Sequence, residues 1–137
     1  DQVNIENVFN TAIIVRTLPN ADEKLSATYD AENLPPYFSN EAMHKIAAVG
    51  IQHLLVDMPS IDLAFDEGKL VNHHFFWNVE QGSHDLNGST ASSKTITEMI
   101  YVPNDISDGR YLLQIQITNF MSDAAPSRPI IFPLELS

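Results

Sequence analysis

Two adjacent histidines stand beside three aromatic residues near the middle of the chain. His73 and His74 are followed by Phe75, Phe76 and Trp77. A neutral imidazole nitrogen is the commonest protein ligand for a metal ion, and neighbouring aromatic rings would limit the access of water. Adjacent residues on a helix or strand point in different directions, so both histidines rarely bind one ion. The same pattern also fits a histidine that is hydrogen-bonded inside the core, and both interpretations stay open.

A carboxylate interrupts an apolar strand face later in the chain. Within the predicted strand Thr95–Val102, Glu98 shares its face with Ile96 and Ile100. A buried carboxylate without a partner is strongly unfavourable, so Glu98 needs a metal ion, a salt bridge or exposure at a sheet edge. Glu98 is therefore a candidate metal ligand, and an edge position is the simpler alternative.

Asp57 is the third candidate, because it closes the apolar segment His53–Met58. Proteins of the α/β class place binding sites at the carboxyl ends of central strands. A carboxylate at this position could equally accept hydrogen bonds from the backbone of a neighbouring loop. The sequence does not separate these two roles. It contains no Gly-rich phosphate loop, serine nucleophile elbow or His-Glu-x-x-His motif.

The elements that must position these residues begin with a strand, a helix and a second strand. Residues 7–18 and 53–58 carry the continuous apolar runs typical of strands covered on both faces. The segment 20–38 is polar and rich in turn formers, which predicts a loop. Ser39 is a candidate N-cap for an amphipathic helix that ends at Gly50. This order predicts a β-α-β unit with parallel strands.

The second half of the chain predicts a short helix and three strands. The helix is expected within Lys69–Val79, and Glu80–Ser93 has the composition of a flexible surface insertion. The strands are expected at Thr95–Val102, Tyr111–Thr118 and Ile130–Leu136. The sequence therefore predicts a mixed α/β fold. Because it has no internal repeat and no linker, residues 1–137 are predicted to form a single domain.

Composition limits the partners to be expected. Seven basic residues against 18 acidic ones give a net charge of −11. Nucleic acids and anionic membranes are bound by clustered Lys and Arg, so neither is an expected partner. The chain has no cysteine, which excludes disulfide and thiolate chemistry. The acidity is explained most simply by solubility, although some carboxylates could converge on a cation.

Six segments of the sequence, in order along nearly the whole chain, are similar to the second half of one enzyme family. The most specific are His53–Asp62 and Asp66–Trp77. The others are Ala12–Thr17, Pro35–Ala42, Thr97–Pro103 and Pro126–Pro133. On these segments the chain resembles the C-terminal part of the cyclase family of metal-dependent hydrolases, which includes bacterial kynurenine formamidases and isatin hydrolases.

This resemblance implies a swivelling β/β/α fold and hydrolysis of a small-molecule amide, formamide or lactam with a divalent metal, zinc or manganese. It implies that His73, the first of the pair, and Glu98 are metal ligands. Glu80 is the alternative second ligand, because it lies nearer to His73 in the sequence. The resemblance also places three residues in the substrate pocket: Asp57, Ser60 and His74.

The chain departs from the family in lacking the signature His-x-Gly-Thr-His-x-Asp, which supplies the other ligands and the general base from the N-terminal half. Two ligands fall short of the three that a catalytic zinc usually takes from the protein. The resemblance therefore implies a fragment that is inactive alone, and a partner in the missing half or in a second copy. The alternative is a non-catalytic scaffold or assembly module of the same fold.

Overall fold

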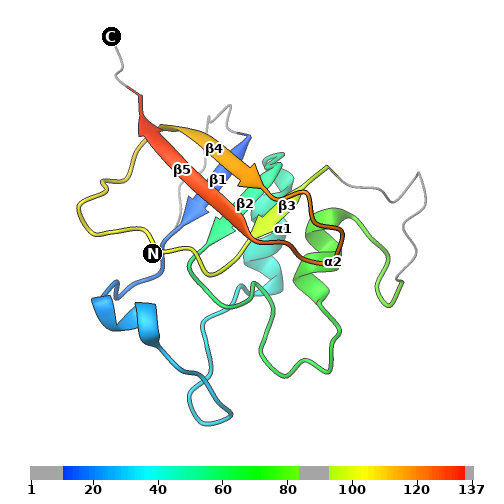
Figure 1. The fold of residues 1–137 in the computed structure, drawn as a ribbon. Helices are drawn as coiled ribbons and strands as arrows, with labels where there is room; N and C mark the ends of the chain where they lie inside the picture. Colours follow the sequence, from blue (N-terminus) through cyan, green and yellow to red (C-terminus); the bar gives the residue numbers. More distant parts are fainter. Residues whose placement is uncertain (1–10, 84–92, 135–137) are drawn as a thin grey trace. The chain divides into compact units, whose positions relative to one another are not determined.

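In a computed structural model, residues 11–83 and 93–134 are described, and they form a mixed α/β structure (Figure 1). The predicted order of a β-α-β unit, a short helix and three further strands is confirmed. The elements are β1 (Ala12–Val15), the 3-10 helix η1 (Asp22–Ser26), α1 (Asn40–Ala48), β2 (His53–Val56), α2 (Val71–Trp77), β3 (Thr95–Thr97), β4 (Tyr111–Ile117) and β5 (Ser127–Pro133). Two compact units, 1–102 and 103–137, divide the chain. That these two units form a single domain stays a prediction.

The first unit contains a three-stranded parallel sheet with the strand order β1-β2-β3. The central strand β2 is buried from Leu54 onward, as its continuous apolar run predicts. By contrast, β1 lies at one edge of this sheet and is only half-buried along its length, although its sequence is equally apolar. The predicted strand 7–18 is shorter in the structure, and its first residues lie outside the described ranges.

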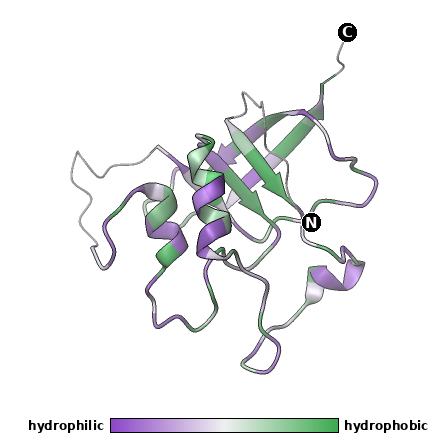
Figure 2. Cartoon of the chain, turned by 180° about the vertical axis from the view of Figure 1, so that it is seen from behind, coloured by the Kyte–Doolittle hydropathy of each residue, from purple (hydrophilic) through white to green (hydrophobic). Residues whose placement is uncertain are grey.

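Helices α1 and α2 lie side by side on one face of the parallel sheet (Figures 1 and 2). As predicted, Ser39 is the N-cap of α1, where its hydroxyl accepts a hydrogen bond from the backbone N–H of Ala42 at 3.2 Å. Gly50 follows the helix with a φ of 78°, a conformation that glycine adopts without strain. The buried side of α1 carries Met43 and Ile46, whereas Val49 is exposed.

The hydrophobic core of this unit lies between the sheet and the two helices. Its members come from both helices, from β2 and from the segments around β2. They are Met43, Ile46, Ile51, Leu54, Val56, Met58, Ile61 and Phe76. Phe76 is completely buried although α2 has only seven residues. Because isolated helices of this length are unstable in water, α2 depends on this packing.

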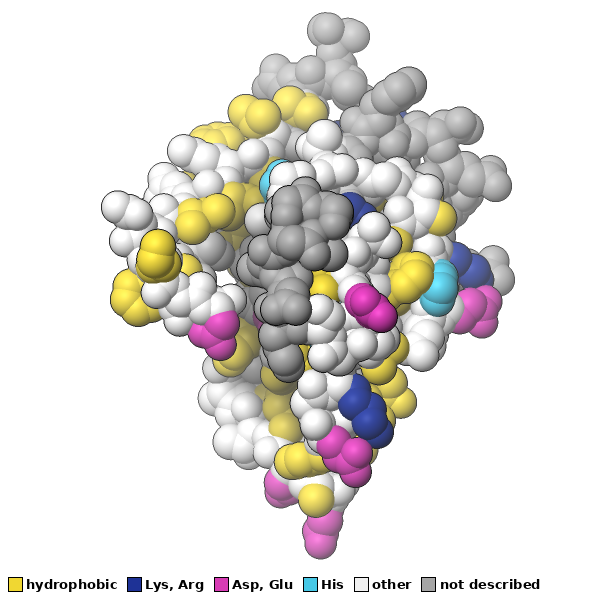
Figure 3. Space-filling view, turned by 90° about the vertical axis from the view of Figure 1, so that its right-hand side faces the viewer, with side chains coloured by type: hydrophobic (Ala, Val, Ile, Leu, Met, Phe, Trp, Pro, Cys, Tyr) yellow, Lys and Arg dark blue, Asp and Glu magenta, His cyan; other side chains and the backbone are white. Residues whose placement is uncertain are grey.

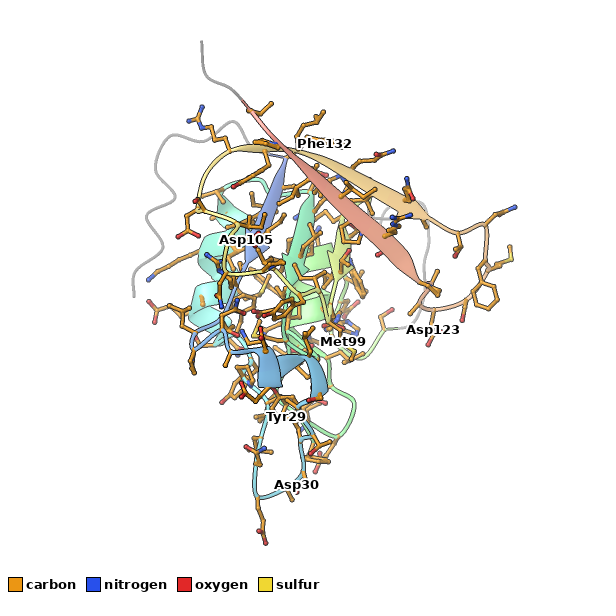
Figure 4. All side chains as sticks on the ribbon, turned by 60° about the vertical axis from the view of Figure 1, so that its left-hand side comes forward. Tyr29, Asp30, Met99, Asp105, Asp123 and Phe132 are labelled. Carbon is orange, nitrogen blue, oxygen red and sulfur yellow. The ribbon has the colours of Figure 1, made fainter. Side chains whose placement is uncertain are left out.

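β3 is shorter than predicted, because the backbone leaves the strand conformation soon after Thr97. Met99, labelled in Figure 4, has a φ of 59°, which lies in the left-handed region. Its side chain is exposed, and Ile100 then donates a backbone hydrogen bond to Val56 at 3.1 Å. The strict alternation expected for residues 95–102 is therefore interrupted at the position that follows Glu98.

The second unit is an antiparallel pair of strands, β4 and β5, with Leu112 opposite Phe132 in the register. Strand β4 alternates between half-buried and exposed residues as predicted, except that Ile117 at its end is exposed. Phe132 lies near the end of β5, and Asp123 lies in the loop before that strand (Figure 4). None of the helices in the described ranges of the chain is long and apolar enough to cross a membrane.

Candidate metal-binding site

The carboxyl ends of the three parallel strands meet at one edge of the sheet, and polar residues follow each of them. Thr17 follows β1, Asp57 follows β2, and Glu98 follows β3. Sheets of this kind bind ligands at this edge, because the loops that leave the strands gather there. Asp57 and Glu98, two of the candidate residues from the sequence, therefore lie on loops that the fold brings to the same side.

The ring of His73 lies between two carboxylates, and the three side chains form the cluster Asp62–His73–Glu98. The Nδ1 atom of His73 lies 2.6 Å from Oδ2 of Asp62, and its Nε2 atom lies 3.3 Å from Oε1 of Glu98. His73 and Asp62 are buried, and the side chain of Glu98 is about one quarter exposed, at 26%. The structure thus brings together the two predicted ligands, His73 and Glu98, and adds Asp62.

Asp62 is held in place by the first turn of α2. Its Oδ1 atom accepts a hydrogen bond from the backbone N–H of Asn72 at 2.6 Å, and Oδ2 accepts one from that of His73 at 3.3 Å. Leu70, the residue before the helix, provides no side-chain cap. Asp62 therefore satisfies helix N–H groups from ten or more residues upstream, a role that local capping patterns do not reveal.

Glu98 points toward the loop that follows β2. Its Oε1 atom accepts a hydrogen bond from the backbone N–H of Ile61 at 2.9 Å. Glu98 lies beyond the end of β3, and the left-handed turn at Met99 follows it. The strand expected to place Glu98 on one face with Ile96 and Ile100 does not extend that far. The carboxylate is partly buried and has partners, although it follows β3, an edge strand of the sheet, so both predicted explanations for it stay open.

The surroundings of His73 raise its pKa above 6.5. Burial acts in the opposite direction and is the largest single effect, because it disfavours the charged ring. Hydrogen bonding to Glu98 and Asp62, together with the negative charge of both carboxylates, outweighs burial. The cluster therefore favours a positive charge at or beside the imidazole.

His74 points away from this cluster, as expected for a neighbour on a helix. It is buried, and its Nδ1 atom lies 2.8 Å from the backbone carbonyl oxygen of Glu80. Glu80 itself is exposed. Ser60, the other predicted pocket residue, accepts a hydrogen bond on its hydroxyl from the backbone N–H of Asp62 at 3.1 Å. The pocket roles of His74 and Ser60 stay predictions, since both have structural partners here.

Asp57 is completely buried and has a full set of donors. The backbone N–H of Thr17 donates to Oδ2 at 2.9 Å, and the Thr17 hydroxyl donates to Oδ1 at 2.9 Å. The ammonium group of Lys24, from η1, lies 2.8 Å from Oδ2. The carboxylate thus accepts backbone and side-chain hydrogen bonds, one of its two predicted roles, while its place in a pocket stays a prediction. Nothing in the sequence distinguishes Lys24 as this partner, because it is a single lysine in a polar segment.

Asn72 joins the start of α2 to two loops. Its side-chain amide donates to the backbone carbonyl oxygens of Phe38 at 2.8 Å and Ile61 at 2.9 Å. Its Oδ1 atom is buried, and no hydrogen-bond partner for it is present among the described residues. Asn72 was missed in the sequence, because nothing distinguishes it from a solvated polar residue at a helix start.

The two predicted ligands do not belong to a larger ligand group in the part of the chain that is described. There, no set of three or more His, Cys, Asp or Glu side chains is arranged to hold a metal ion. Asp62 is close to His73 but contacts the ring nitrogen opposite to the one that faces Glu98. One imidazole nitrogen and one carboxylate therefore face each other as the available donors.

Comparison of the chain with known protein families, with curated proteins and with solved structures finds no significant match. The resemblance to the cyclase family therefore stays a prediction from the sequence segments quoted above.

Replacing Lys24 by Met should lower the free energy of unfolding by on the order of 3 kcal/mol, because it leaves the buried carboxylate of Asp57 without its counter-ion. Lys45→Met is the matched control, since Lys45 pairs with Glu41 at 2.9 Å on the exposed surface of α1. Urea denaturation monitored by circular dichroism measures both. Equal effects of the two substitutions would contradict a structural role for the buried pair.

The raised pKa of His73 gives a stability that depends on pH. A histidine whose folded pKa is raised contributes stability that is fully present below its unfolded value, 6.5, and is lost as the pH rises through the folded pKa. The difference in unfolding free energy between wild type and His73→Gln should therefore shrink as the pH rises above 6.5. Urea denaturation in the presence of a chelator measures it. A difference that is constant or grows with pH would exclude this linkage.

Proposed function

We propose that this chain is the C-terminal part of a metal-dependent hydrolase of amide, formamide or lactam bonds, similar to the cyclase family. One observation supports this most: Nε2 of His73 lies 3.3 Å from Oε1 of Glu98. His73 belongs to α2 and Glu98 follows β3, and the family resemblance implies both of them as ligands. An imidazole nitrogen and a carboxylate oxygen facing one another are a donor pair suited to zinc or manganese.

The donor set fits part of a metal site. His73 and Glu98 would hold the ion from this chain, and a catalytic zinc usually takes three protein ligands. We propose that the remaining ligands and the general base come from the N-terminal half that the family resemblance implies. A divalent metal, when bound, lowers the pKa of a coordinated water and polarises the scissile carbonyl.

The other predicted pocket residues would then shape the site without reacting. Asp57 is occupied by Lys24 and Thr17, so it fixes the loop that follows β2. Ser60 lies within that loop and supports Asp62. Basic side chains are few and lie apart on the face drawn in Figure 3, which supports a small-molecule substrate over a nucleic acid.

Metal occupancy tests this proposal in the protein expressed from its full reading frame. His73→Ala should reduce zinc or manganese occupancy much more than His74→Ala, because only His73 faces Glu98. Glu98→Gln should likewise act more strongly than Glu80→Gln, since the side chain of Glu80 is exposed. Equilibrium dialysis with elemental analysis measures occupancy, and hydrolysis of an aryl formamide and a lactam measures activity. A full-length protein with the signature motif that neither binds metal nor hydrolyses these compounds would sink the proposal.

A scaffold or assembly role is the second candidate, and the two edges of the hairpin β4–β5 favour it. Leu134 donates a backbone hydrogen bond to Arg110, so these two residues form a hydrogen-bonded pair. Hydrogen-bonded and non-hydrogen-bonded pairs alternate along an antiparallel ladder, so the odd-numbered residues of β4 direct their backbone N–H and C=O groups away from β5. On β5 the outward positions include Pro129 and Pro133, which have no N–H to offer. Within the described residues this sheet has only two strands, so β4 presents the open edge.

The open edge of β4 also suits pairing with a second copy. An antiparallel arrangement centred on Gln114 would place Leu113 opposite Ile115 of the other copy, with outward backbone groups on both sides. The strand has no charged residue and no proline to prevent such pairing. A two-stranded hairpin is marginally stable by itself, and additional strands stabilise it.

Leu113→Pro should convert such a dimer to a monomer, because it removes an outward N–H at the centre of β4. Ile131→Pro is the matched control, since Ile131 lies opposite Leu113 but faces the edge of β5 that already contains prolines. Light scattering coupled to size-exclusion chromatography gives the mass. A wild-type monomer, or the same loss of mass in both variants, would argue against assembly through β4.

A further inference from the structure

The two carboxylates beside His73 cannot both accept a hydrogen bond from a neutral ring. A neutral imidazole carries one N–H and one lone pair, so it donates to one neighbour and presents its lone pair to the other. Both neighbours are acceptors when ionised. The position of the proton therefore decides which ring nitrogen is available to a metal ion.

Distance and burial decide between the two positions. Nδ1 lies 2.6 Å from Asp62, whereas Nε2 lies 3.3 Å from Glu98. The side chain of Asp62 is 4% exposed, and that of Glu98 is 26% exposed. A lone pair of Nδ1 placed against Asp62 would meet a carboxylate at the shorter distance and with less water to screen it. The proton is therefore more stable on Nδ1.

We infer that Asp62 is a positioning residue that holds the proton of neutral His73 on Nδ1 and so directs the lone pair of Nε2 toward Glu98. Nε2 and Oε1, two electron-rich atoms 3.3 Å apart, then form a pair that a cation stabilises. A carboxylate that fixes the far nitrogen of a metal-binding histidine orients the ring and raises its basicity as a ligand. The location of the proton stands on the geometry alone, and only the effect on metal binding rests on the proposed function.

The backbone keeps Asp62 in this orientation. Its two oxygens accept hydrogen bonds from the N–H groups of Asn72 and His73 at the start of α2. Rotation of the carboxylate away from His73 would leave buried N–H groups without partners, which is unfavourable. The group that sets the proton on the ring is thus also the cap of the helix that carries the ring.

Nitrogen NMR of the ring tests the inference in the 137-residue chain, with a chelator present and at a pH where His73 is neutral. We expect the proton on Nδ1 in the wild type. In Asp62→Asn, the side-chain oxygen can still accept from Asn72, while the amide N–H₂ faces Nδ1 and favours the tautomer protonated on Nε2. The proton should therefore move to Nε2, which then donates to Glu98.

Asp66→Asn is the matched control. Asp66 also accepts backbone hydrogen bonds before α2, from Gly68 at 2.8 Å and Leu70 at 2.7 Å, but it is only half-buried and is not a partner of His73. The tautomer of His73 should not change in this variant. A wild-type proton on Nε2, or an unchanged tautomer in a folded Asp62→Asn protein, overturns the inference. If Asp62→Asn does not fold, the wild-type spectrum still decides.

Zinc affinity of the full-length protein gives the second readout. Asp62→Asn should weaken zinc binding on the order of 10- to 100-fold, and Asp66→Asn should leave it unchanged. An unchanged affinity despite a moved proton overturns the positioning role toward the metal. Absence of zinc binding in a wild type whose proton is on Nδ1 instead refutes the proposed function and leaves the tautomer inference standing.

Discussion

Two buried carboxylates need hydrogen-bond donors or positive charges as partners, and the polar contacts around β2 and α2 depend on this requirement. Asp57 and Asp62 follow β2 within one short loop, and both side chains are almost fully withdrawn from water. A buried carboxylate without donors is strongly unfavourable, so neighbouring segments must supply them. For Asp57 they come from Lys24 and Thr17, and for Asp62 from the start of α2 and from His73. The loop between the two residues therefore ties η1 and α2 to the sheet.

Apolar packing stabilises α2, and polar contacts determine its orientation. Phe76 inserts into the core and supplies apolar burial, which stabilises a helix too short to persist alone. Packing by itself would tolerate small rotations of the helix. The hydrogen bonds from Asn72 and His73 to Asp62 are directional, and they fix how the helix is turned about its axis. The placement of His73 against Glu98 follows from both.

The parts of the fold that could be predicted are those with local causes. The cap at Ser39, the end of α1 at Gly50 and the alternation in β4 depend on neighbours in the sequence, and all three are present. Asp62 could not be recognised, because an acidic loop contains it together with Asp66 and Glu67. Only its position directly after the buried Ile61 distinguishes it. Glu98 lies beside His73, but not through the predicted strand, which the turn at Met99 ends, and its role as a ligand stays a prediction.

The adjacent histidines show why spacing alone could not assign their roles. His74 faces the other end of α2, where its Nδ1 lies beside the carbonyl oxygen of Glu80. A carbonyl oxygen can only accept, so this contact requires the proton on Nδ1. The backbone carbonyl of His74 in turn accepts from Val79 at 2.9 Å, just after Asn78 leaves the helix in the left-handed conformation. His74 thus has its partners at the carboxyl end of the helix whose amino end Asp62 caps, and only His73 faces Glu98.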